Sequence, residues 1–217
     1  MIGIVSYGLG NIQAFVNIYK RLNIDAEVTS TPDMLEAVDR IILPGVGAFD
    51  WAMTRLNESG LRDAIEDAVF KQGKLVLGIC VGMQMMAKRS EEGELAGLGW
   101  IDGEVKKFRK IVRREELEVS SQEKGFRGEV MLPHMGWNDV QLRKENGLFK
   151  NLDSDARFYF LHSYYFKCNN LDDIIATTEY GIHFTSALNH GNIYGVQFHP
   201  EKSHQWGIQL LKNFAEM

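Results

Sequence analysis

The sequence predicts an α/β fold with a central, mostly parallel sheet, helices on both faces and an antiparallel extension. In the first ninety residues, short β-branched runs alternate with segments of helical period, an order typical of parallel strands joined by helices. From Gly99 onwards, strand-like segments follow one another without helices, which indicates antiparallel pairing. The 217 residues are 45% hydrophobic and contain no Pro/Gly-rich linker or internal repeat, so we expect one domain over residues 1–217.

The first half is expected to alternate strands and helices. Aliphatic runs place strands at Ile2 to Ser6, Ala26 to Thr29, Arg40 to Leu43 and Lys74 to Ile79. Apolar residues three and four positions apart place helices at Asn11 to Leu22, Asp50 to Leu56 and Leu61 to Lys71. These elements would form the parallel part of the sheet and its covering helices.

The second half is expected to supply the antiparallel extension. Its strands are placed at Trp100 to Phe108, Val130 to Leu132, Trp137 to Leu142, Arg157 to His162, Asp173 to Thr177, Thr185 to Asn189 and Ile193 to Phe198. The last two strands are expected to form a hairpin through His190 and Gly191. A helix capped by Ser203 is expected from His204 to Phe214. Mixed charge and weak periodicity between Lys106 and Arg127 predict an exposed excursion.

Composition and charge exclude several classes of protein. The 24 Lys and Arg residues against 29 Asp and Glu give a net charge of −5, unlike the basic footprint of a nucleic-acid-binding protein. No apolar run approaches the roughly 18 residues that a membrane-spanning helix needs. The first seven residues have neither the basic flank nor the length of a signal peptide. We therefore expect a cytoplasmic protein that binds neither nucleic acid nor a membrane.

The sequence also gives no support for a cofactor or a metal site. Two glycine pairs, at residues 8–10 and 45–47, lack the third glycine of a dinucleotide-binding fingerprint, because Gln13 and Asp50 take its place. The two cysteines and six histidines show none of the paired spacings of a zinc site. We expect the protein to use no cofactor and no metal.

A candidate nucleophile lies at the end of an apolar strand. Residues 75–84 lead from this strand into Gly78-x-Cys80-x-Gly82 and then into a Met-rich helical segment. This pattern resembles a nucleophile elbow, in which flanking glycines relieve crowding and the next backbone N–H can stabilise an oxyanion. A helix N-terminus also favours a thiolate. The alternative is that Cys80 is a small buried hydrophobic residue.

A thiolate nucleophile needs a general base, and the base needs an acid that orients it. His199 ends a strand, and Glu201 follows two residues later, where side chains of an extended segment share one face. The alternative is a strand-ending histidine beside a solvated glutamate. Because Cys80 and this His-x-Glu pair occur in one chain, the catalytic interpretation is favoured over coincidence.

Three further segments contain residues suited to a site. Gly45 and Gly47 follow an apolar strand and would let the backbone approach a ligand or adopt a positive φ, as an oxyanion loop must. A plain strand-to-helix turn is the alternative there. The polar aromatic segments Leu132 to Asn138 and Phe160 to Tyr164 fit either a core or a binding site.

Seven segments together resemble, in chain order, the motifs of the class I glutamine amidotransferases, which have a flavodoxin-like fold. They are Tyr7-Gly-Leu-Gly-Asn11, Leu43-Pro-Gly-Val-Gly-Ala-Phe49, Leu77-Gly-Ile-Cys-Val-Gly-Met-Gln84, Ser90-Glu-Glu-Gly93, Pro133-His-Met-Gly-Trp-Asn138, His162-Ser-Tyr164 and Gly195-Val-Gln-Phe-His-Pro-Glu-Lys-Ser203. The resemblance spans nearly the whole chain.

This resemblance implies that the protein hydrolyses glutamine to glutamate and ammonia. Cys80 would attack the side-chain amide, His199 would be the acid/base, and Glu201 would orient it. The implied oxyanion hole is formed by backbone N–H groups at Val46, Gly47 and Val81. The residues implied in binding glutamine are Gly45, Gln84, Glu92, Ser163 and Tyr164. Glu92 would pair with the ammonium group of the substrate.

The resemblance further implies a partner that consumes the ammonia. Within the family, the motifs match glutaminase subunits that form a heterodimer with a TIM-barrel synthase, HisF, of histidine biosynthesis. That synthase receives ammonia through a protected channel and converts PRFAR to imidazole glycerol phosphate and AICAR. The positions that match the interface are Asn11, Trp137, Asn138 and Lys202.

Three departures from the family pattern leave other functions open. Val81 stands where leucine is usual, Trp100 replaces an aliphatic residue, and the segment from Lys106 to Arg127 is longer than usual. They resemble a related branch that supplies ammonia to a sugar amidotransferase in surface-polysaccharide synthesis, which stays an alternative to the histidine pathway that the interface positions favour. A non-catalytic regulatory module on the same scaffold is a second alternative, although Cys80 and its two partner residues argue against it. A cysteine hydrolase of the peptidase or peroxide-stress type would not call for Glu92.

Overall fold

The fold is centred on a sheet whose parallel half comes from the N-terminal part of the chain. The computed structural model describes residues 1–108 and 131–217. Its parallel strands are β1 (Ile2–Val5), β2 (Ala26–Thr29), β3 (Arg40–Gly45), β4 (Leu75–Cys80) and β12 (Ile193–Val196). They lie in the order β2-β1-β3-β4-β12, and all are paired in parallel. The parallel sheet predicted from the alternating pattern is confirmed.

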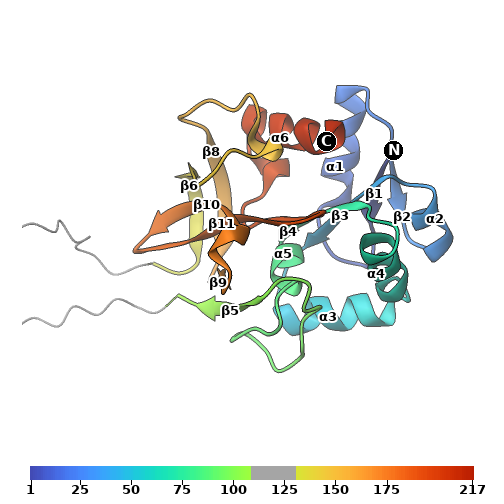
Figure 1. Ribbon diagram of the computed structural model, residues 1–217, viewed down its shortest axis with the longest axis horizontal. Helices are drawn as coiled ribbons and strands as arrows, with labels where there is room; N and C mark the ends of the chain where they lie inside the picture. The colour runs from blue at the N-terminus through green and yellow to red at the C-terminus, as the bar shows by residue number, and fades with distance from the viewer. Residues whose placement is uncertain (109–130) are drawn as a thin grey trace, which may run out of the picture.

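Helices cover both faces of this sheet (Figure 1). One face is covered by α1 (Ile12–Leu22) and α6 (His204–Glu216). The other is covered by α3 (Phe49–Glu58), α4 (Arg62–Phe70) and the short α5 (Val81–Met85). A further short helix, α2 (Pro32–Glu36), lies at the β2 edge and packs against α4. Because both faces are covered, strands β1, β3 and β4 are almost continuously buried.

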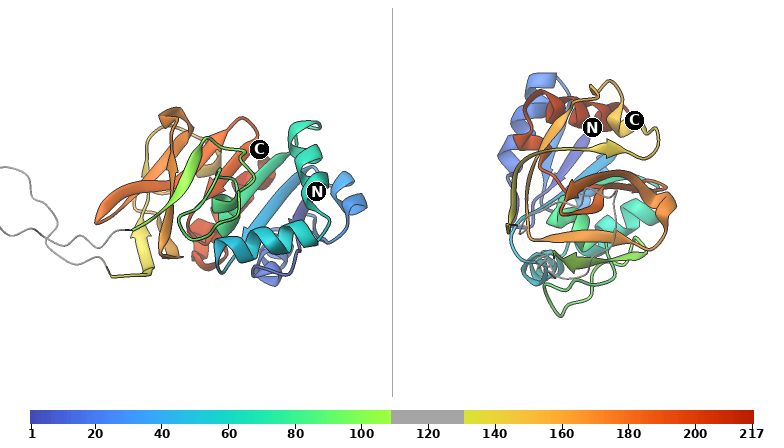
Figure 2. Two further views of the ribbon diagram at one scale, coloured as in Figure 1. Left: turned by 90° about the horizontal axis from the view of Figure 1, so that it is seen from below. Right: turned by 90° about the vertical axis from the view of Figure 1, so that its left-hand side faces the viewer.

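The antiparallel extension continues the same sheet beyond β12. There β11 (Ile182–His190) pairs with β12, and β10 (Ile174–Tyr180) and then β7 (Gln141–Leu142) follow. A branch is formed by β9 (Tyr164–Cys168), which pairs with both β11 and β5 (Gly103–Lys107). A separate ribbon joins β6 (His134–Asp139) to β8 (Arg157–His162). Figure 2 shows these strands gathered at the end of the molecule away from the N-terminus.

Several expected boundaries differ from the structure. Residues 131 and 132 are irregular, so the strand expected at Val130 to Leu132 is wrong for them, and Val130 lies outside the described residues. The single strand expected from Trp137 to Leu142 is divided between β6 and β7, which pair with different strands. Neither α2 nor β9 was expected from the sequence. The five residues of α2 are too few to establish a periodicity.

Two local details of the C-terminal region are corrected as well. His190 is still paired, with Ile193, so the hairpin turn is made by Gly191 and Asn192. Ser203 precedes α6 but does not cap it through its side chain. Its hydroxyl instead donates to the carbonyl oxygen of His199 at 2.6 Å and accepts from the backbone N–H of Tyr159 at 3.0 Å. Ser203 therefore ties α6 to the segment that carries His199.

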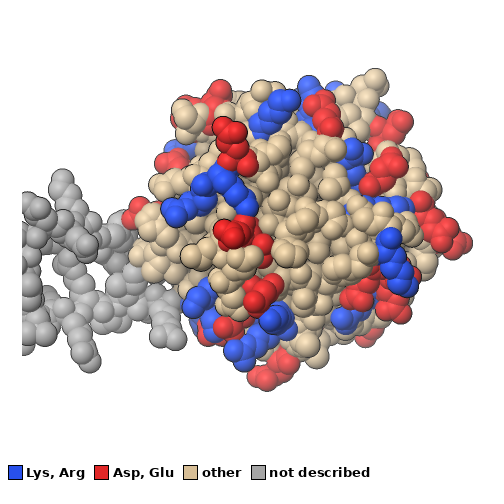
Figure 3. All heavy atoms as spheres, viewed as in Figure 1, with Lys and Arg blue, Asp and Glu red and all other residues tan. Residues whose placement is uncertain are grey.

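The described surface carries both signs of charge. On the face shown in Figure 3, the Lys and Arg side chains are interspersed with Asp and Glu. None of the described helices is long and apolar enough to cross a membrane. Of the excursion expected between Lys106 and Arg127, residues 109–127 lie outside the described part of the chain.

Candidate active site

Cys80 lies in a strained turn between β4 and α5. Its φ of 55° and ψ of −111° are unusual for a residue with a side chain. The turn fits only because its neighbours are small: a Cβ on Gly82 would lie 2.0 Å from the carbonyl oxygen of Leu43. A Cβ on Gly78 would lie 2.7 Å from Cε of Met86. The elbow geometry predicted from the glycine spacing is therefore present.

His199 and Glu201 are brought to this elbow by the segment that follows β12. Nδ1 of His199 lies 2.9 Å from Oε1 of Glu201, and their side chains are 4% and 2% exposed. His199 also lies beside Cys80 in the cavity wall, where the side chain of Cys80 acts on the charge of the imidazole. Because Nδ1 is occupied by the carboxylate, Nε2 is the ring atom available to the sulfur. The three residues thus form the connected arrangement that the sequence predicted.

The electrostatics of His199 suit acid/base chemistry. Burial lowers the pKa of His199, but the interactions with Cys80 and Glu201 act in the opposite direction and raise the pKa to about 10. The imidazolium form is therefore stabilised beside the sulfur. A thiolate beside such an imidazolium can attack an amide carbon, and the imidazolium can then protonate the departing nitrogen.

A cavity of about 320 Å³ opens above the sulfur of Cys80. Its walls come from both halves of the sheet and from the ribbon, and they consist of Val46, Gly47, Cys80, Val81, Gln84, Glu92, Pro133, Leu161, His162, Ser163, Tyr164, His199 and Lys202. The cavity lies at the carboxyl ends of β3 and β4, where ligands bind in open parallel sheets.

Most of the predicted substrate residues meet in this cavity. Gln84 is 2% exposed, and its Nε2 donates to the carbonyl oxygen of Tyr164 at 3.1 Å and to Oε1 of Gln197 at 3.0 Å. Oε2 of Glu92 accepts from the backbone N–H of Phe49 at 2.9 Å. Gly45 is not a wall residue but lies beneath the elbow, where a Cβ would be 2.2 Å from the nitrogen of Gly82.

Sequence reasoning missed Gln197. Its Nε2 lies 3.7 Å from Sγ of Cys80, and its Oε1 receives the hydrogen bond from Gln84, so it links two residues of the site. Gln197 alternates with Gly195 and His199 along an extended segment, and this period of two could have placed it on the same face. His162, Pro133 and Leu161 also line the cavity, although no role for them was predicted.

The predicted oxyanion loop reaches the cavity through Val46 and Gly47. Gly47 has a φ of +86°, a conformation that favours glycine. Val46 is 38% exposed and projects from a surface loop, whereas Val81 is buried at the start of α5. The loop packs beside α3, where Cδ1 of Trp51 lies 3.8 Å from the position of a Cβ on Gly47.

The residues predicted for a partner interface do not share one environment. The ring of Trp137 stacks on His204 at 5.1 Å, with an angle of 3° between the two planes. Lys202 lines the cavity. Asn11 precedes α1 without capping it through its side chain. Asn138 is held within the chain, because its Nδ2 donates to the carbonyl oxygen of Glu179 and its Oδ1 accepts from the next backbone N–H.

The described residues contain no cluster of three or more His, Cys, Asp or Glu side chains that could hold a metal ion. The second cysteine, Cys168, lies buried in β9, away from the cavity walls. Burial raises the pKa of its thiol to about 12, which makes it a poor nucleophile at neutral pH.

Comparison with known proteins places this geometry in a family. Residues 4–217 match the family described as glutamine amidotransferase class-I. The chain belongs to the class I glutamine amidotransferase family. Among solved structures, this amidotransferase is similar in fold to one described as a glutamine amidotransferase, with a TM-score of 0.70 and 18% identity over 100% of this chain and 99% of the other. It is also similar in fold to PurLQS from Thermotoga maritima, with a TM-score of 0.69 and 15% identity over 99% and 97% of the two chains.

Relatives found by sequence share a much higher identity with this amidotransferase than these two solved structures do. It is 56% identical to a protein of Bdellovibrio bacteriovorus and 48% identical to one of Leptospira borgpetersenii, in each case over 100% of both chains. Both relatives are named imidazole glycerol phosphate synthase subunit HisH.

Proposed function

We propose that this amidotransferase is the glutaminase subunit of an imidazole glycerol phosphate synthase. It would release ammonia from glutamine and pass it to a TIM-barrel partner of the HisF type, which forms imidazole glycerol phosphate and AICAR from PRFAR. The observation that carries the proposal is that Cys80 and His199 lie side by side in the wall of one cavity, with Glu201 bound to Nδ1 of His199 behind them. The names of relatives that match the full length of the chain support the pathway.

In the proposed reaction, the thiolate of Cys80 attacks the side-chain amide carbon of glutamine. The carbonyl oxygen becomes an oxyanion, which backbone N–H groups at Val81 and at Val46 or Gly47 would stabilise. The intermediate collapses as His199 gives its proton to the leaving nitrogen, which releases ammonia and leaves a thioester. Water then loses a proton to His199 and attacks the thioester, and glutamate departs. Glu201 holds the imidazole in position throughout.

The cavity walls would recognise the rest of glutamine. Glu92 would pair with the α-ammonium group, since its Oε2 is fixed by Phe49 while the described residues donate no hydrogen bond to Oε1. The other residues proposed to surround the substrate are Gln84, Ser163 and Tyr164, whereas Gly45 would contribute only through its close packing under the elbow. A cavity of about 320 Å³ is at the lower end of the range for small-molecule sites, which suits a single amino acid.

A partner would bind where the ribbon β6–β8 meets the cavity. On the outer face of this ribbon, Met135 faces Leu161 and Trp137 faces Tyr159 in paired positions, and the first pair is 65% and 37% exposed. Lys202 supplies a charge at the same edge. We propose that this surface, together with Asn11 and Asn138, forms the heterodimer interface. Ammonia released at Cys80 would then enter the partner without reaching solvent.

Two of the three departures from the family pattern, Trp100 and Val81, do not favour another acceptor. Trp100 is 8% exposed and packs edge-on against Phe70 at 5.8 Å, so it belongs to the core on the α4 side. Val81 does line the cavity, but its proposed role uses the backbone N–H, which valine and leucine share. With the relatives named as HisH, the histidine pathway has more support than surface-polysaccharide synthesis. The two unpaired cysteines also favour the reducing cytoplasm that the sequence predicted.

The proposal is tested by comparing two nitrogen sources. The Cys80→Ala protein in complex with the synthase should lose formation of imidazole glycerol phosphate from PRFAR and glutamine. It should retain formation from PRFAR and ammonium salt, because the thiolate serves only to release ammonia. If Cys80→Ala supports glutamine-dependent synthesis at the wild-type rate, the assignment is wrong.

A further inference from the structure

The first turn of α3 contacts the loop that carries Glu92. Asp50, the second residue of α3, accepts two backbone hydrogen bonds from this loop: Oδ2 from Glu94 at 2.9 Å and Oδ1 from Leu95 at 3.1 Å. Next to it, the backbone N–H of Phe49 donates to Oε2 of Glu92 at 2.9 Å. Two consecutive residues of α3 therefore hold both the backbone and the functional side chain of one loop.

Gly93 makes this contact possible. A Cβ at Gly93 would lie 2.0 Å from Oδ1 of Asp50 and 2.2 Å from its Cγ. The carboxylate thus lies directly against the loop backbone, where no other residue type fits without displacement. The close approach brings both oxygens of Asp50 within reach of N–H groups, an arrangement in which charge-assisted hydrogen bonds are strong.

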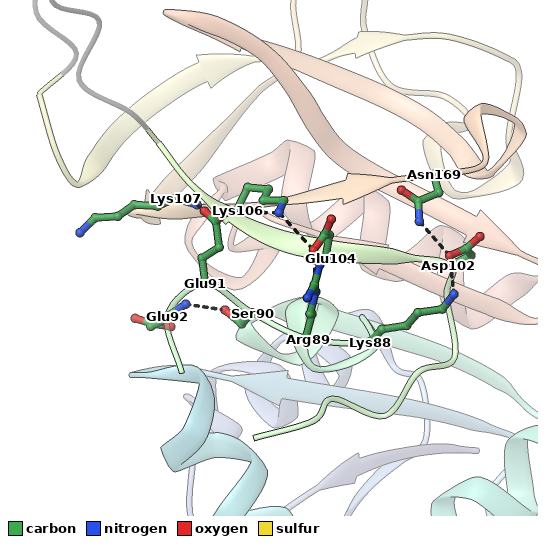
Figure 4. A network of polar contacts seen from close by, with 10 residues as sticks. All are labelled: Lys88, Arg89, Ser90, Glu91, Glu92, Asp102, Glu104, Lys106, Lys107 and Asn169. Carbon is green, nitrogen blue, oxygen red and sulfur yellow. Dashed lines mark hydrogen bonds and ion pairs between the residues drawn. The ribbon is translucent and has the colours of Figure 1, made fainter. Parts of the chain in front are cut away.

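The opposite side of the same loop is attached to β5. Figure 4 shows Glu91 reaching toward β5, whereas Glu92 projects from the loop in a different direction. The two oxygens of Glu91 contact Nζ of Lys106 at 3.2 Å and the backbone N–H of Lys107 at 2.8 Å. The backbone N–H of Glu91 also donates to the carbonyl oxygen of Val105 at 2.9 Å. Glu92 therefore lies between two sets of hydrogen bonds, one that joins the loop to β5 and one that joins it to α3.

We propose that Asp50 is a positioning residue for recognition of the α-ammonium group of glutamine, a role that rests on the function proposed above. By fixing residues 93–95, Asp50 holds Glu92 at the cavity wall, with one carboxylate oxygen on Phe49 and the other directed to the substrate. Asp50 itself does not line the cavity, so it acts through Glu92 and does not touch glutamine.

The charge of Asp50 adds to this effect. Burial raises the pKa of Glu92, the hydrogen bond from Phe49 lowers it, and the negative charge of Asp50 raises it again. Two carboxylates placed close together create a negative potential that a bound ammonium group relieves. Substitution of Asp50 by Asn would remove that charge and would also turn an amide N–H toward the N–H groups of the loop.

The test measures discrimination between L-glutamine and glutaramate, the analogue that lacks the α-amino group, in the complex with the synthase. The variants are Asp50→Ala and Asp50→Asn, with Glu92→Gln as the reference. Asp63→Ala is the matched control, because Asp63 is the exposed second residue of α4. In both Asp50 variants, we expect KM for glutamine to rise roughly ten-fold with a much smaller change in kcat, as for lost ground-state binding. The preference for glutamine over glutaramate should fall toward that of Glu92→Gln, and Asp63→Ala should behave as wild type.

Several outcomes would overturn the proposal, and they are distinguishable. If both Asp50 variants reduce kcat/KM equally for the two substrates, Asp50 only supports the fold and the inference is wrong. If Glu92→Gln keeps the full preference for glutamine, the role of Glu92 is wrong and the inference fails with it. A wild-type complex that releases no glutamate contradicts the proposed function itself. Size-exclusion chromatography reports whether each complex is assembled, and if Asp50→Ala does not fold, unchanged discrimination in Asp50→Asn is sufficient to reject the inference.

Discussion

Nδ1 of His134 lies 3.0 Å from Nε2 of His162, and the two residues are paired across β6 and β8. Nδ1 of His162 lies 2.7 Å from the carbonyl oxygen of Tyr164, so this nitrogen carries a proton and Nε2 accepts. His134 then donates through Nδ1, and its Nε2 accepts from the side-chain amide of Asn138 at 3.2 Å. Both histidines are therefore fixed as neutral tautomers, and His162 also lines the cavity.

Because of this histidine pair, we expect the free energy of unfolding to decrease in acid. Burial lowers the pKa of His134 to about 4 and that of His162 to about 3, below the value of about 6.5 expected in the unfolded chain. As the pH falls below about 6.5, only the unfolded state binds these protons, so the free energy of unfolding should decrease by roughly 1.4 kcal/mol per pH unit for each histidine. The contribution is fully present above about pH 6.5. Chemical denaturation between pH 7 and pH 4 measures it.

The matched variants for this prediction are His134→Gln and His183→Gln, since His183 lies exposed on β11. The first should flatten the pH dependence and the second should leave it unchanged. His199 has the opposite sign: its raised pKa gives stability that is present below about pH 6.5 and is lost as the pH rises toward 10, so it does not contribute to the acid slope. Equal slopes in wild type and His134→Gln would contradict the account.

The two cysteines should differ in reactivity. Cys80 lines the cavity beside the imidazole of His199, whereas Cys168 is buried in β9 and burial raises the pKa of its thiol to about 12. Brief treatment with iodoacetamide at pH 7 should therefore add one label, which intact-protein mass spectrometry detects, and glutaminase activity should decrease in parallel. The label should disappear in Cys80→Ala and persist in Cys168→Ala. Labelling of Cys168 first would be incompatible with the proposed nucleophile.

The loop at Gly47 should control the rate of glutamine hydrolysis. Its φ of +86° is strained for any other residue, although a Cβ would meet only Cδ1 of Trp51 at 3.8 Å. Gly47→Ala should therefore disturb the backbone N–H groups proposed for the oxyanion and lower glutamine-dependent kcat in the complex by roughly 10²- to 10³-fold. Ammonium-dependent synthesis should not change.

Gly191→Ala is the control for Gly47→Ala. Gly191 also has a positive φ, of +57°, and lies with open space around it in the β11–β12 turn. In this control, backbone strain should lower the free energy of unfolding, whereas kcat should stay unchanged. If the two variants hydrolyse glutamine at the same rate, the backbone around Gly47 has no special part in catalysis.

Local spacing was enough to predict the geometry of the elbow at Cys80 and the contact between His199 and Glu201. Gly78 and Gly82 flank Cys80 within a few residues, and Glu201 is two residues from His199, so both geometries follow from short-range sterics. The alternation of buried runs and helical segments likewise predicted the parallel sheet, because it depends on periodicity.

The remaining features depend on contacts between distant segments. Asp50 and Gly93 are far apart in sequence, and neither has a local pattern that reveals their packing. Without the family resemblance, Glu92 looks like a solvated residue in a charged stretch. Ser203 has the residue type of a helix cap, but its hydroxyl is bound to His199 and Tyr159 instead. The residue type indicates which local hydrogen bonds a side chain can form, and contacts with distant segments decide which of them it does form.

We propose that this chain supplies ammonia to imidazole glycerol phosphate synthesis. The most direct measurement mixes the purified chain with the HisF-type TIM-barrel synthase from the same source and follows glutamate release with and without PRFAR. We expect slow hydrolysis by the chain alone, activation by the synthase, and further activation when PRFAR binds, because a ligand of the partner acts only through the complex. No stimulation by PRFAR, together with activation by a sugar-modifying synthase, would contradict the claim and move the protein to surface-polysaccharide synthesis.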